Sequence, residues 1–483
     1  MKTISVAEMV ELEQRSMARG VSGEELMGRA GREAARLAET IFRRYRHLRS
    51  VAVVTGAGNN AGDGFVVAAA LKLPVTVYAA VPRAKLRGDA ALFASRLPAA
   101  VPVVESAAPP VFRPDQLIVD ALLGTGCRGR LREPFADYIA AINASGAPVL
   151  SLDLPSGLDG DSGAIDPAAV RADWTVTFGF PKTGLFRREG PRHAGVIKVA
   201  EIGLIDGLDA DLPGKFDVFT RFDARPLLGR LVYGGYKNTR GRLLVFAGSR
   251  DYPGAARLCT LAAQRAGTGF VRLVSSAPAD AGFAASLVRC EFESSLFDQV
   301  DAVAAGPGWG ASPEHAMLLH RILAAGKVAV LDADALNILG RNPELWRPSP
   351  QVVLTPHLGE FQRLAAAWGI EIGNDVAANA LNLARAMNCV VVLKDPRTVV
   401  ASPDGDYSIN SSGSPALGTA GSGDVLTGVI GAFLAAGLTA ADAAKLGVYL
   451  HGLAGEVIPQ RGLIADDLPG RLADAMLEVS PVS

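Results

Sequence analysis

The chain has 483 residues, of which 49% are hydrophobic and 20% are charged, a composition that permits a large buried core and excludes global disorder. Its 48 Lys and Arg residues nearly balance its 49 Asp and Glu residues, so a broad nucleic-acid surface, which needs a basic excess, is not expected. At about 150 residues per domain, this length suits two large α/β domains or about three smaller ones.

Two helices are predicted before the first strand. Each begins with a Ser that is followed three residues later by a Glu, Ser5 with Glu8 and Ser22 with Glu25, so a hydroxyl and a carboxylate meet the free N–H groups of a helix N-terminus. Short apolar, β-branched runs then alternate with helical stretches, which predicts a parallel sheet covered on both faces. The predicted strands are 51–55, 75–78, 101–104, 117–119, 149–152 and 175–178.

A domain boundary is predicted where this pattern fails, between residues 206 and 230. We therefore expect two domains, residues 1–215 and residues 225–483. Because the halves share no motif, they are predicted to be two different three-layer αβα folds, each with a mostly parallel sheet. In the second half, strands are predicted at 243–246, 270–274, 302–305, 328–331, 352–354 and 390–393, and helices at 255–266, 313–324, 359–367, 375–387, 424–436 and 440–457.

The cysteines and the N-terminus indicate a cytoplasmic protein. The four cysteines lie far apart and form no Cys-x-x-Cys pair, so we expect reduced thiols, not disulfides or a zinc site. The N-terminal segment is interrupted by Glu8, Glu11 and Glu13 and lacks the apolar core of a signal peptide. No apolar run approaches the roughly 18 residues that span a bilayer, so neither a membrane nor a nucleic acid is an expected partner.

A glycine-rich segment follows the first predicted strand. Residues 56–64 read Gly-Ala-Gly-Asn-Asn-Ala-Gly-Asp-Gly and lead into a helix. Glycines let backbone N–H groups approach an anion at a helix N-terminus, although a generic tight turn also uses them. The spacing differs from the Gly-x-Gly-x-x-Gly dinucleotide fingerprint. The adjacent Asn residues and the Asp are more polar than a turn requires, which favours a binding site.

Further polar residues follow other strands of the first domain. Asp120 ends the fourth predicted strand and leads into a second glycine-rich loop, whose arginines can pair with phosphate. Asp153 and Ser156 follow the fifth strand. Because the carboxyl ends of parallel strands meet at one edge of a sheet, these residues and Asn60 are expected to lie together. Such hard oxygen ligands predict a cation site, although each Asp alone is equally suited to cap a helix or turn.

Together these segments resemble the N-terminal epimerase domain of the bifunctional NAD(P)H-hydrate repair proteins, over residues 1–215. The resemblance implies a Rossmann-like domain that interconverts the R and S forms of hydrated NADH and NADPH (NADHX and NADPHX) at C6. It also implies a K⁺ ion held by Asn60, Asp120 and Ser156. The family has Gly where this chain has Ala61, a change we expect to be tolerated, although a required positive φ would strain it. The implied substrate-binding residues are Asn59, Asn60, Ala61, Gly62, Asp63, Gly124, Thr125, Gly126, Cys127, Arg128, Gly129, Arg130 and Asp153.

Epimerisation at C6 requires an acid–base group, because the reversible loss and return of a proton or of the hydroxyl needs a carboxylate near that carbon. Asp153 is the candidate. Lys182 follows the sixth predicted strand and is suited to stabilising negative charge, the alternative being a solvated surface lysine.

The most informative segment of the second half is residues 418–428, Gly-Thr-Ala-Gly-Ser-Gly-Asp-Val-Leu-Thr-Gly. A glycine-rich turn here feeds an apolar helix, whose free N–H groups form an anion hole, with Asp424 at the helix start. An Asp at this place also caps helices well, but a cap does not need Gly-x-Gly before it. The arrangement suits phosphoryl transfer, in which Asp424 accepts a hydroxyl proton. The turn resembles that of the ribokinase-like superfamily.

Five ordered segments narrow this resemblance to the ADP-dependent (S)-NAD(P)H-hydrate dehydratase domain of the same repair proteins, over residues 225–483. They are 236–241, 247–255, 305–308, 332–337 and 355–360. The implied hydrate-binding residues are Ala255, Gly308, His357 and Asp424. The implied nucleotide-binding residues are Lys394, Asp395, Pro396, Arg397, Thr398 and Gly423.

Two features of the second half need a structural answer. Asp395 stands where the family has Gly, and a carboxylate beside a phosphate site is unfavourable unless it faces solvent or helps to bind Mg²⁺. His357 follows a strand, where a lone His is often a hydrogen-bonded core residue, but its Thr-Pro-His-x-Gly-Glu context favours a site.

The resemblance implies a two-step repair reaction with ADP and Mg²⁺ in the second domain, K⁺ in the first, and a homo-oligomer, by analogy a tetramer. Hydroxide leaves poorly, so a kinase-like fold would phosphorylate the C6 hydroxyl before the ring nitrogen expels phosphate. The alternatives are a ribokinase-like kinase of vitamin precursors and a non-catalytic binding protein, of which Asp395 would be the mark.

Overall fold

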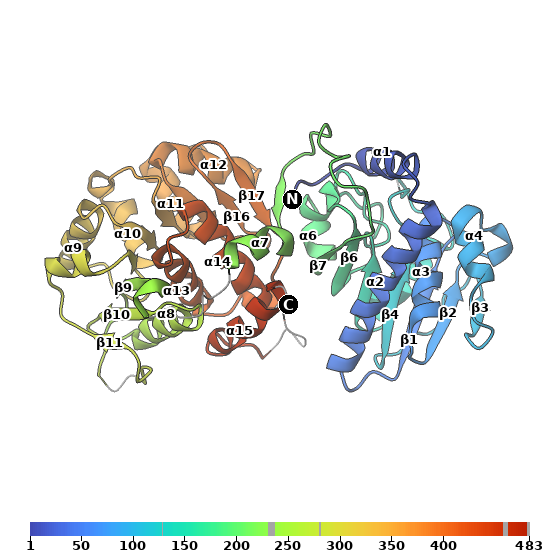
Figure 1. Ribbon diagram of the computed structural model, residues 1–483, viewed down its shortest axis with the longest axis horizontal. Coiled ribbons are helices and arrows are strands. Elements are labelled where there is room, and N and C mark those ends of the chain that lie inside the picture. Colours follow the sequence, from blue (N-terminus) through green and yellow to red (C-terminus); the bar gives the residue numbers. More distant parts are fainter. Residues whose placement is uncertain (128, 230–236, 280–281, 457–461, 481–483) are drawn as a thin grey trace. The chain divides into compact units, whose positions relative to one another are not determined.

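The structure is a computed structural model that describes residues 1–127, 129–229, 237–279, 282–456 and 462–480. These residues fall into two compact units, Met1–Asp217 and Val218–Ser483 (Figure 1). Each unit has its own mostly parallel sheet. The prediction of two different α/β folds is therefore confirmed.

The first unit contains a seven-stranded sheet in the order β3-β2-β1-β4-β5-β6-β7, in which all neighbouring strands are parallel. The chain builds outward from β1 and then, in the other direction, from β4, so the topological switch lies between these two strands. Its strands are β1 (Ser50–Thr55), β2 (Val75–Ala79), β3 (Val103–Glu105), β4 (Gln116–Ala121), β5 (Val149–Leu152), β6 (Trp174–Phe178) and β7 (Val196–Ala200).

Helices cover both faces of this sheet. Val54 packs with Tyr138 and Ile142 of α5 on one face, whereas α2 and α3 lie across the other face (Figure 1). On that second face, a Cβ built on Gly64 would lie 3.3 Å from the side chain of Val53, so α3 approaches β1 closely. The helices are α1 (Val6–Met17), α2 (Gly23–Arg44), α3 (Asn59–Ala70), α4 (Gly88–Ser95), α5 (Phe135–Ala144) and α6 (Gly190–His193).

The predicted capping residues begin the first two helices. In α1, the Glu8 backbone N–H donates to the Ser5 hydroxyl and the Ser5 N–H donates to the Glu8 carboxylate, as a capping box requires. In α2, Ser22 accepts from the Glu25 N–H, but the Glu25 carboxylate forms an ion pair with Arg29 instead. The second box is therefore only half formed, because the carboxylate finds a cation one turn along the helix.

The second unit contains a ten-stranded sheet in the order β11-β10-β9-β12-β13-β14-β15-β16-β17-β8. Strands β9 to β15 pair in parallel, and β16 and β17 continue the sheet antiparallel. The switch lies between β9 and β12. The strands are β8 (Asp217–Phe219), β9 (Arg242–Phe246), β10 (Phe270–Val274), β11 (Val288–Arg289), β12 (Ala302–Ala305), β13 (Val328–Leu331), β14 (Val352–Leu354), β15 (Val390–Leu393), β16 (Val399–Ala401) and β17 (Tyr407–Asn410).

A buried helix, α13, forms the centre of the second unit's core. Its side chains pack with those of α8, α14 and α15 in one apolar cluster, which explains why its sequence is apolar all round. The helices are α7 (Arg221–Leu228), α8 (Pro253–Arg265), α9 (Pro313–Ala324), α10 (Asp334–Arg341), α11 (Leu358–Ala367), α12 (Val376–Met387), α13 (Ser422–Ala435), α14 (Ala440–Ala454) and α15 (Asp467–Val479).

Several elements lie outside the predicted ones, namely β7, β8, β11, β16 and β17, together with α6, α7, α10 and α15. Strands β11 and β16 have two and three residues, too few for a recognisable period. Helix α10 begins at Asp334, inside the Asp-Ala-Asp segment after β13, and its N-cap residue Ala333 has a φ of 47°. No side chain caps the start of this helix, so the sequence shows no helix-start signal there.

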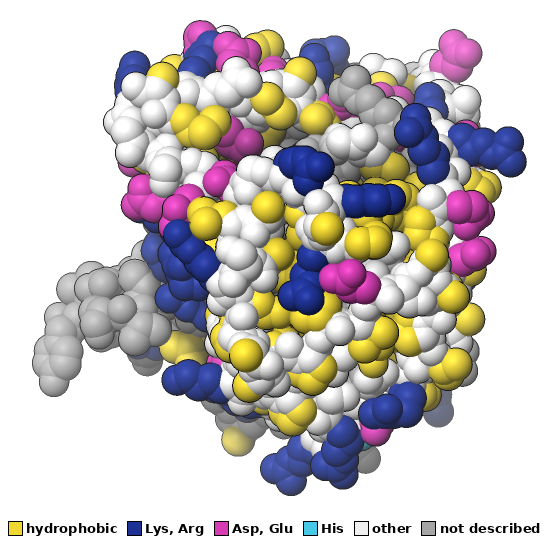
Figure 2. All heavy atoms as spheres, turned by 90° about the vertical axis from the view of Figure 1, so that its right-hand side faces the viewer, with side chains coloured by type: hydrophobic (Ala, Val, Ile, Leu, Met, Phe, Trp, Pro, Cys, Tyr) yellow, Lys and Arg dark blue, Asp and Glu magenta, His cyan; other side chains and the backbone are white. Residues whose placement is uncertain are grey.

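On the face drawn in Figure 2, basic and acidic side chains of the described residues are interspersed, with apolar side chains between them. Among the described residues, no helix combines the length and the hydrophobicity that a membrane span requires.

The contact between α13 and α8 generates a stability prediction. A Cβ at Gly428 would lie 2.1 Å from the Cys259 carbonyl oxygen, so Gly428→Ala must push the helices apart and is expected to lower the free energy of unfolding by about 1–3 kcal/mol. Gly470 in α15 has open space around its Cβ position, so Gly470→Ala is expected to raise it by about 0.5–1 kcal/mol. Urea unfolding of both variants tests this, and equal stability would contradict the tight packing.

Candidate active sites

Four oxygen-bearing groups meet at the switch point of the first unit. Asp120 ends β4, and its carboxylate accepts from the Ser151 hydroxyl at 2.8 Å, the Ser156 backbone N–H at 2.9 Å and the Ser156 hydroxyl at 2.5 Å. The Ser156 Oγ also lies 3.1 Å from the Leu123 carbonyl oxygen. Asn60, in the first turn of α3, donates its amide to that same carbonyl at 2.9 Å. The structure thus brings together Asn60, Asp120 and Ser156.

This oxygen cluster is short of positive charge. Burial raises the pKa of Asp120, which hydrogen bonds from Ser156 only partly offset. In the described part of the chain, no basic side chain forms an ion pair with Asp120. The Asn60 Oδ1 is buried and has no hydrogen-bond partner. A carboxylate, an amide oxygen, a hydroxyl and a carbonyl that share a buried place suit a monovalent cation.

The predicted loop 59–63 is the first turn of α3. Ala61 is fully buried inside this helix and is not among the described residues with positive φ. The Gly of the family is therefore not needed here for its backbone freedom, and the expected tolerance of Ala61 has a structural reason. Asn59 and Gly62 belong to the same turn, where a Cβ on Gly62 would lie 2.4 Å from the Met27 sulfur.

The second glycine-rich loop follows β4. Gly124 packs against Asn60, whose Cβ lies 3.1 Å from a Cβ built on Gly124. Thr125 and Cys127 are half-buried, whereas Gly126, Gly129 and Arg130 are exposed. Arg128 lies outside the described residues.

Asp153 and Lys182 form a buried ion pair beside this cluster. The Lys182 ammonium donates to Asp153 at 2.5 Å and to the Phe178 carbonyl at 2.8 Å, and the lysine is only 1% exposed. Asp153 also accepts from the Thr177 hydroxyl and the Phe178 N–H, each at 3.2 Å. The alternative of a solvated Lys182 is therefore wrong. Asp153 has a φ of 64°, a strained conformation that is typical of functional sites.

Two further carboxyl groups share this charged environment. Burial raises the pKa of Asp63 well above its ordinary value, and the nearby charges of Asp153 and Glu13 raise it further, against the opposing charge of Lys182. Burial likewise raises the pKa of Glu13, on α1. Because Lys182 is held by Asp153, at least one of the other two carboxyl groups is expected to keep a proton. The sequence analysis gave Glu13 no role.

A second charged cluster lies at the carboxyl ends of the strands in the second unit. Asp332 follows β13, and its carboxylate accepts from the Lys394 ammonium at 2.9 Å and from the Thr427 hydroxyl at 2.8 Å. Lys394 lies 3.9 Å from the Glu360 carboxylate. Burial lowers the pKa of Lys394, but Asp332 and Glu360 outweigh this and raise it. The lysine therefore stays charged beside Asp424.

Asp424 stands in the first turn of α13, as predicted. Burial raises its pKa to about 7, and the charge of Asp332 adds to the shift, whereas Lys394 opposes it. Gly421, before the helix, has a φ of 89°, and a Cβ at Gly423 would lie 3.4 Å from the Lys394 ammonium and 3.5 Å from Asp332. A Cβ at Gly421 would lie 2.6 Å from the Leu258 side chain, so this position has no room for a side chain of its own.

His357 is the N-cap of α11. Its Nδ1 accepts from the Gly359 N–H at 3.0 Å, and its own backbone N–H donates to Glu360 at 2.9 Å. Its side chain is 55% exposed, so the alternative of a core histidine is wrong. A Cβ built on Gly308, which has a φ of 55°, would lie 2.7 Å from the Ala255 side chain, so these two predicted residues are neighbours.

The residues of the segment 394–398 differ in their exposure to solvent. Asp395 and Pro396 are exposed, and the Thr398 hydroxyl donates to the Asp395 carbonyl at 3.4 Å. Arg397 is buried, donates to the Ser411 carbonyl at 3.2 Å, and burial lowers its pKa to about 10. The exposure of Asp395 removes the main objection to a phosphate site nearby.

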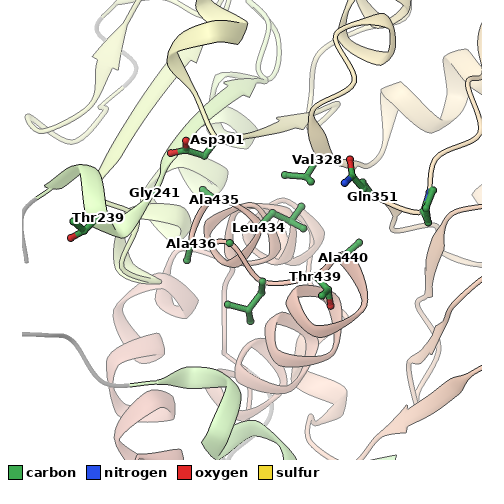
Figure 3. Close-up of a pocket in the computed structure, with 13 residues that line it drawn as sticks. Thr239, Gly241, Asp301, Val328, Gln351, Leu434, Ala435, Ala436, Thr439 and Ala440 are labelled. Atoms are coloured by element: carbon green, nitrogen blue, oxygen red, sulfur yellow. The ribbon is translucent and has the colours of Figure 1, made fainter.

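A cavity of about 700 Å³ lies elsewhere, at the amino ends of the second unit's strands (Figure 3). Gly241, Asp301 and Val328, at the starts of β9, β12 and β13, line it together with the C-terminal end of α13. None of the predicted site residues lines it.

Sequence reasoning assigned no role to Asp332, Glu360, Thr427 and Glu13. Asp332 directly follows an apolar strand and Glu360 ends the Thr-Pro-His-x-Gly-Glu segment, so both carried a usable signal. Thr427 reads as one more small residue of a buried helix. Glu13 reads as one more charge in a surface helix, and only the tertiary fold brings it near Asp63.

The fold and the charged loops define the class of protein, a pair of α/β catalytic domains of which the second has the Gly-x-Gly-Asp helix start of ribokinase-like enzymes. A solved ribokinase-like superfamily protein of Enterococcus faecalis matches 55% of this chain and 96% of its own, with a TM-score of 0.50 and 23% identity, and supports that fold. The ADP/ATP-dependent NAD(P)H-hydrate dehydratase of Bacillus subtilis, co-crystallised with ATP and Mg²⁺, matches with a TM-score of 0.48 and 29% identity over 55% of this chain and 99% of its own.

Comparison of sequences identifies the family more specifically than comparison of structures does. The family described as NAD(P)H-hydrate dehydratase matches residues 243–477, and the family described as YjeF-related protein N-terminus matches residues 23–184. The bifunctional NAD(P)H-hydrate repair enzyme of Coxiella burnetii is 34% identical over 477 residues, 95% of this chain and 96% of the relative. That of Escherichia coli is 34% identical, over 93% of this chain and 88% of the relative. The chain belongs to the family of bifunctional NAD(P)H-hydrate repair enzymes.

Proposed function

We propose that this protein repairs hydrated NADH and NADPH in two steps. The first unit interconverts the R and S hydrates, and the second dehydrates the S form with ADP, releasing NAD(P)H, AMP and phosphate. The observation that supports this most directly is a pair of carboxyl groups, buried Asp63 and half-buried Asp424, each at a strand-end site beside a lysine–aspartate ion pair. Family membership favours repair over the kinase of vitamin precursors, and the exposure of Asp395 removes the mark of a non-catalytic domain.

In the second unit, Asp424 takes the proton of the C6 hydroxyl while that oxygen attacks the β-phosphorus of ADP and AMP leaves. The N–H groups at the start of α13 face the transferred charge. The ring nitrogen lone pair then expels phosphate, and loss of a C5 proton restores the dihydropyridine. Mg²⁺ would arrive on the nucleotide phosphates and neutralise their charge. The described residues contain no cluster of His, Cys, Asp or Glu suited to hold a metal by itself.

The raised pKa of Asp424 sets the pH dependence of dehydration. Because the base must be ionised, the rate with saturating ADP is expected to rise with pH and level off above about 7. Asp424→Asn is expected to lower kcat by about 10²- to 10⁴-fold and to leave epimerisation intact. Asp301→Asn, at the opposite edge of the same sheet, is the matched control and should keep the profile. Absorbance of reduced nicotinamide measures the rate, and a pH-independent rate would contradict the assignment.

In the first unit, the excess of carboxyl groups favours a cationic reaction path. A protonated carboxyl group gives its proton to the C6 hydroxyl, water leaves, and the ring nitrogen lone pair forms an iminium ion at C6. Water returns to the other face and the proton returns to the carboxylate, so the reaction balances. Asp63 suits this role better than Asp153, because Asp153 is held by Lys182, Thr177 and Phe178. Glu13 and the ionised Asp63 would stabilise the cation.

Epimerisation should therefore depend on pH with the opposite sign. The rate is expected to fall as pH rises through the raised pKa of Asp63, because the acid loses its proton. Asp63→Asn is expected to lower the rate by about 10²- to 10⁴-fold and to leave dehydration of the S form unchanged. Asp173→Asn, which removes a half-buried carboxyl group of the same unit whose pKa is also raised by burial, should not alter the profile. Chromatography of the two epimers measures the rate, and an Asp63→Asn variant with wild-type turnover would refute the role.

The oxygen cluster would hold K⁺ through Asn60, Asp120 and Ser156 together with the Leu123 carbonyl. Replacing tetramethylammonium chloride with KCl is expected to stabilise the first unit, by about 2.7 kcal/mol when K⁺ reaches about 100 times its dissociation constant. Asn60→Leu should abolish the response. Asn143→Leu, which removes a structural amide that bonds the Ala169 carbonyl, should keep it. Thermal unfolding at constant ionic strength is the measurement, and an unchanged response in Asn60→Leu would rule out this ligand set.

A further inference from the structure

A buried histidine lies directly behind the anion-binding turn of the second unit. His451, near the C-terminal end of α14, is 7% exposed, and its Nε2 lies 3.1 Å from the Ser422 hydroxyl. The ring also forms a hydrogen bond with the Ser422 backbone. Ser422 is the first residue of α13 and is itself buried. His451 is not among the predicted site residues and has no role in the proposed mechanism.

The turn is rich in glycine, so few of its own side chains can hold its backbone in one conformation. Ser422 stands between Gly421 and Gly423, and Gly421 adopts the left-handed conformation. Glycines leave the backbone the largest conformational freedom, which must be lost when N–H groups are aimed at a phosphoryl group. The Ser422 hydroxyl is the one side-chain group between the glycines, and its partner is His451.

The same end of α14 also holds the segment that leads into the turn. The Ser412 hydroxyl donates to the Tyr449 carbonyl at 2.7 Å, and the Ser414 hydroxyl donates to the Gly455 carbonyl at 2.6 Å. Gly452, next to His451, has no room for a side chain, since a Cβ there would lie 2.0 Å from the Ser412 hydroxyl. Helix α14 therefore contacts the chain before the glycine-rich turn, at Ser412 and Ser414, and at its end, where His451 contacts Ser422 two residues before Asp424.

His451 fills this place as a neutral group. Burial lowers its pKa to about 4, more than the hydrogen bond to Ser422 raises it, and the charge of Lys394 lowers it further. Among the described residues, the charged groups around the turn are Asp332, Asp334, Glu360, Lys394 and Asp424. Arg471 of α15 donates to the Ala454 carbonyl at the end of α14. A neutral imidazole orients Ser422 without adding a second cation beside Lys394, which would favour ionised Asp424 too strongly for a base.

We propose that His451 is a positioning residue of the dehydratase, which fixes Ser422 and with it the first N–H groups of α13 toward the phosphoryl group in transit. His451 does not touch the substrate. This inference rests on the proposed phosphoryl transfer in the second unit and adds a residue to it.

The test is a double-mutant cycle in the full chain with His451→Leu and Ser422→Ala. Each single variant is expected to lower dehydratase kcat by roughly 10- to 100-fold, with a change in KM for the hydrate below about threefold, because the lost alignment affects the transition state. The double variant should be no slower than the slower single variant. His451→Gln, which keeps a hydrogen-bonding group near the Nε2 position, should recover most of the rate. His320→Leu, which removes a histidine from α9, is the matched control.

A second measurement does not depend on activity. Amide hydrogen exchange of peptides that cover residues 418–428 should be faster in His451→Leu than in the wild type and unchanged in His320→Leu. Additive losses in the cycle, or unchanged exchange in His451→Leu, would overturn the positioning role. If the wild type fails to dehydrate the S hydrate with ADP, the proposed function fails, and the exchange result alone then decides whether His451 holds the turn.

Discussion

Burial of carboxyl groups at the carboxyl ends of parallel strands is the constraint on which both sites depend. Removing a carboxylate from water is costly, so each such group needs compensation or must keep a proton. Asp120 receives hydrogen bonds and an arrangement of oxygens that fits a cation. Asp153 and Asp332 receive a lysine each. Among the described residues, neither Asp63 nor Asp424 forms an ion pair of its own, and burial raises the pKa of both.

The two units reach this arrangement from different folds. In each unit, a lysine forms an ion pair with one aspartate. A second carboxyl group lies close by, and burial raises its pKa. What differs is the depth of burial, because Asp63 is only 8% exposed whereas Asp424 is half-buried. Burial, together with the charges of Asp153 and Glu13, raises the pKa of Asp63 well above its ordinary value against the opposing charge of Lys182. Asp424 lies near Lys394, which opposes the shift, and its pKa of about 7 lets it act as a base. The same cost of burial thus yields an acid in one unit and a base in the other.

The sequence predicts the parts of this protein that depend on local pattern. Apolar strands of four to six residues, the helix 313–324 and the Ser5–Glu8 capping box all appear where expected, since each is specified by neighbouring residues. The short antiparallel strands β16 and β17 have no such pattern and exist because the sheet edge offers them partners. Strand-end aspartates could be found by topology alone. The ion pairs could not, because Lys394 meets Asp332 across 62 residues of sequence.

The two reactions are expected to depend on pH with opposite signs, which limits the pH range in which one chain can catalyse both. Burial raises the pKa of the acid, Asp63, well above the ordinary range of Asp and raises that of the base, Asp424, to about 7. The neutral state of His451 belongs to the same balance, because a protonated imidazole near Asp424 would lower the pKa that makes it a useful base. The burial of each carboxyl group and the charges around it, more than its position after a strand, therefore decide what it does.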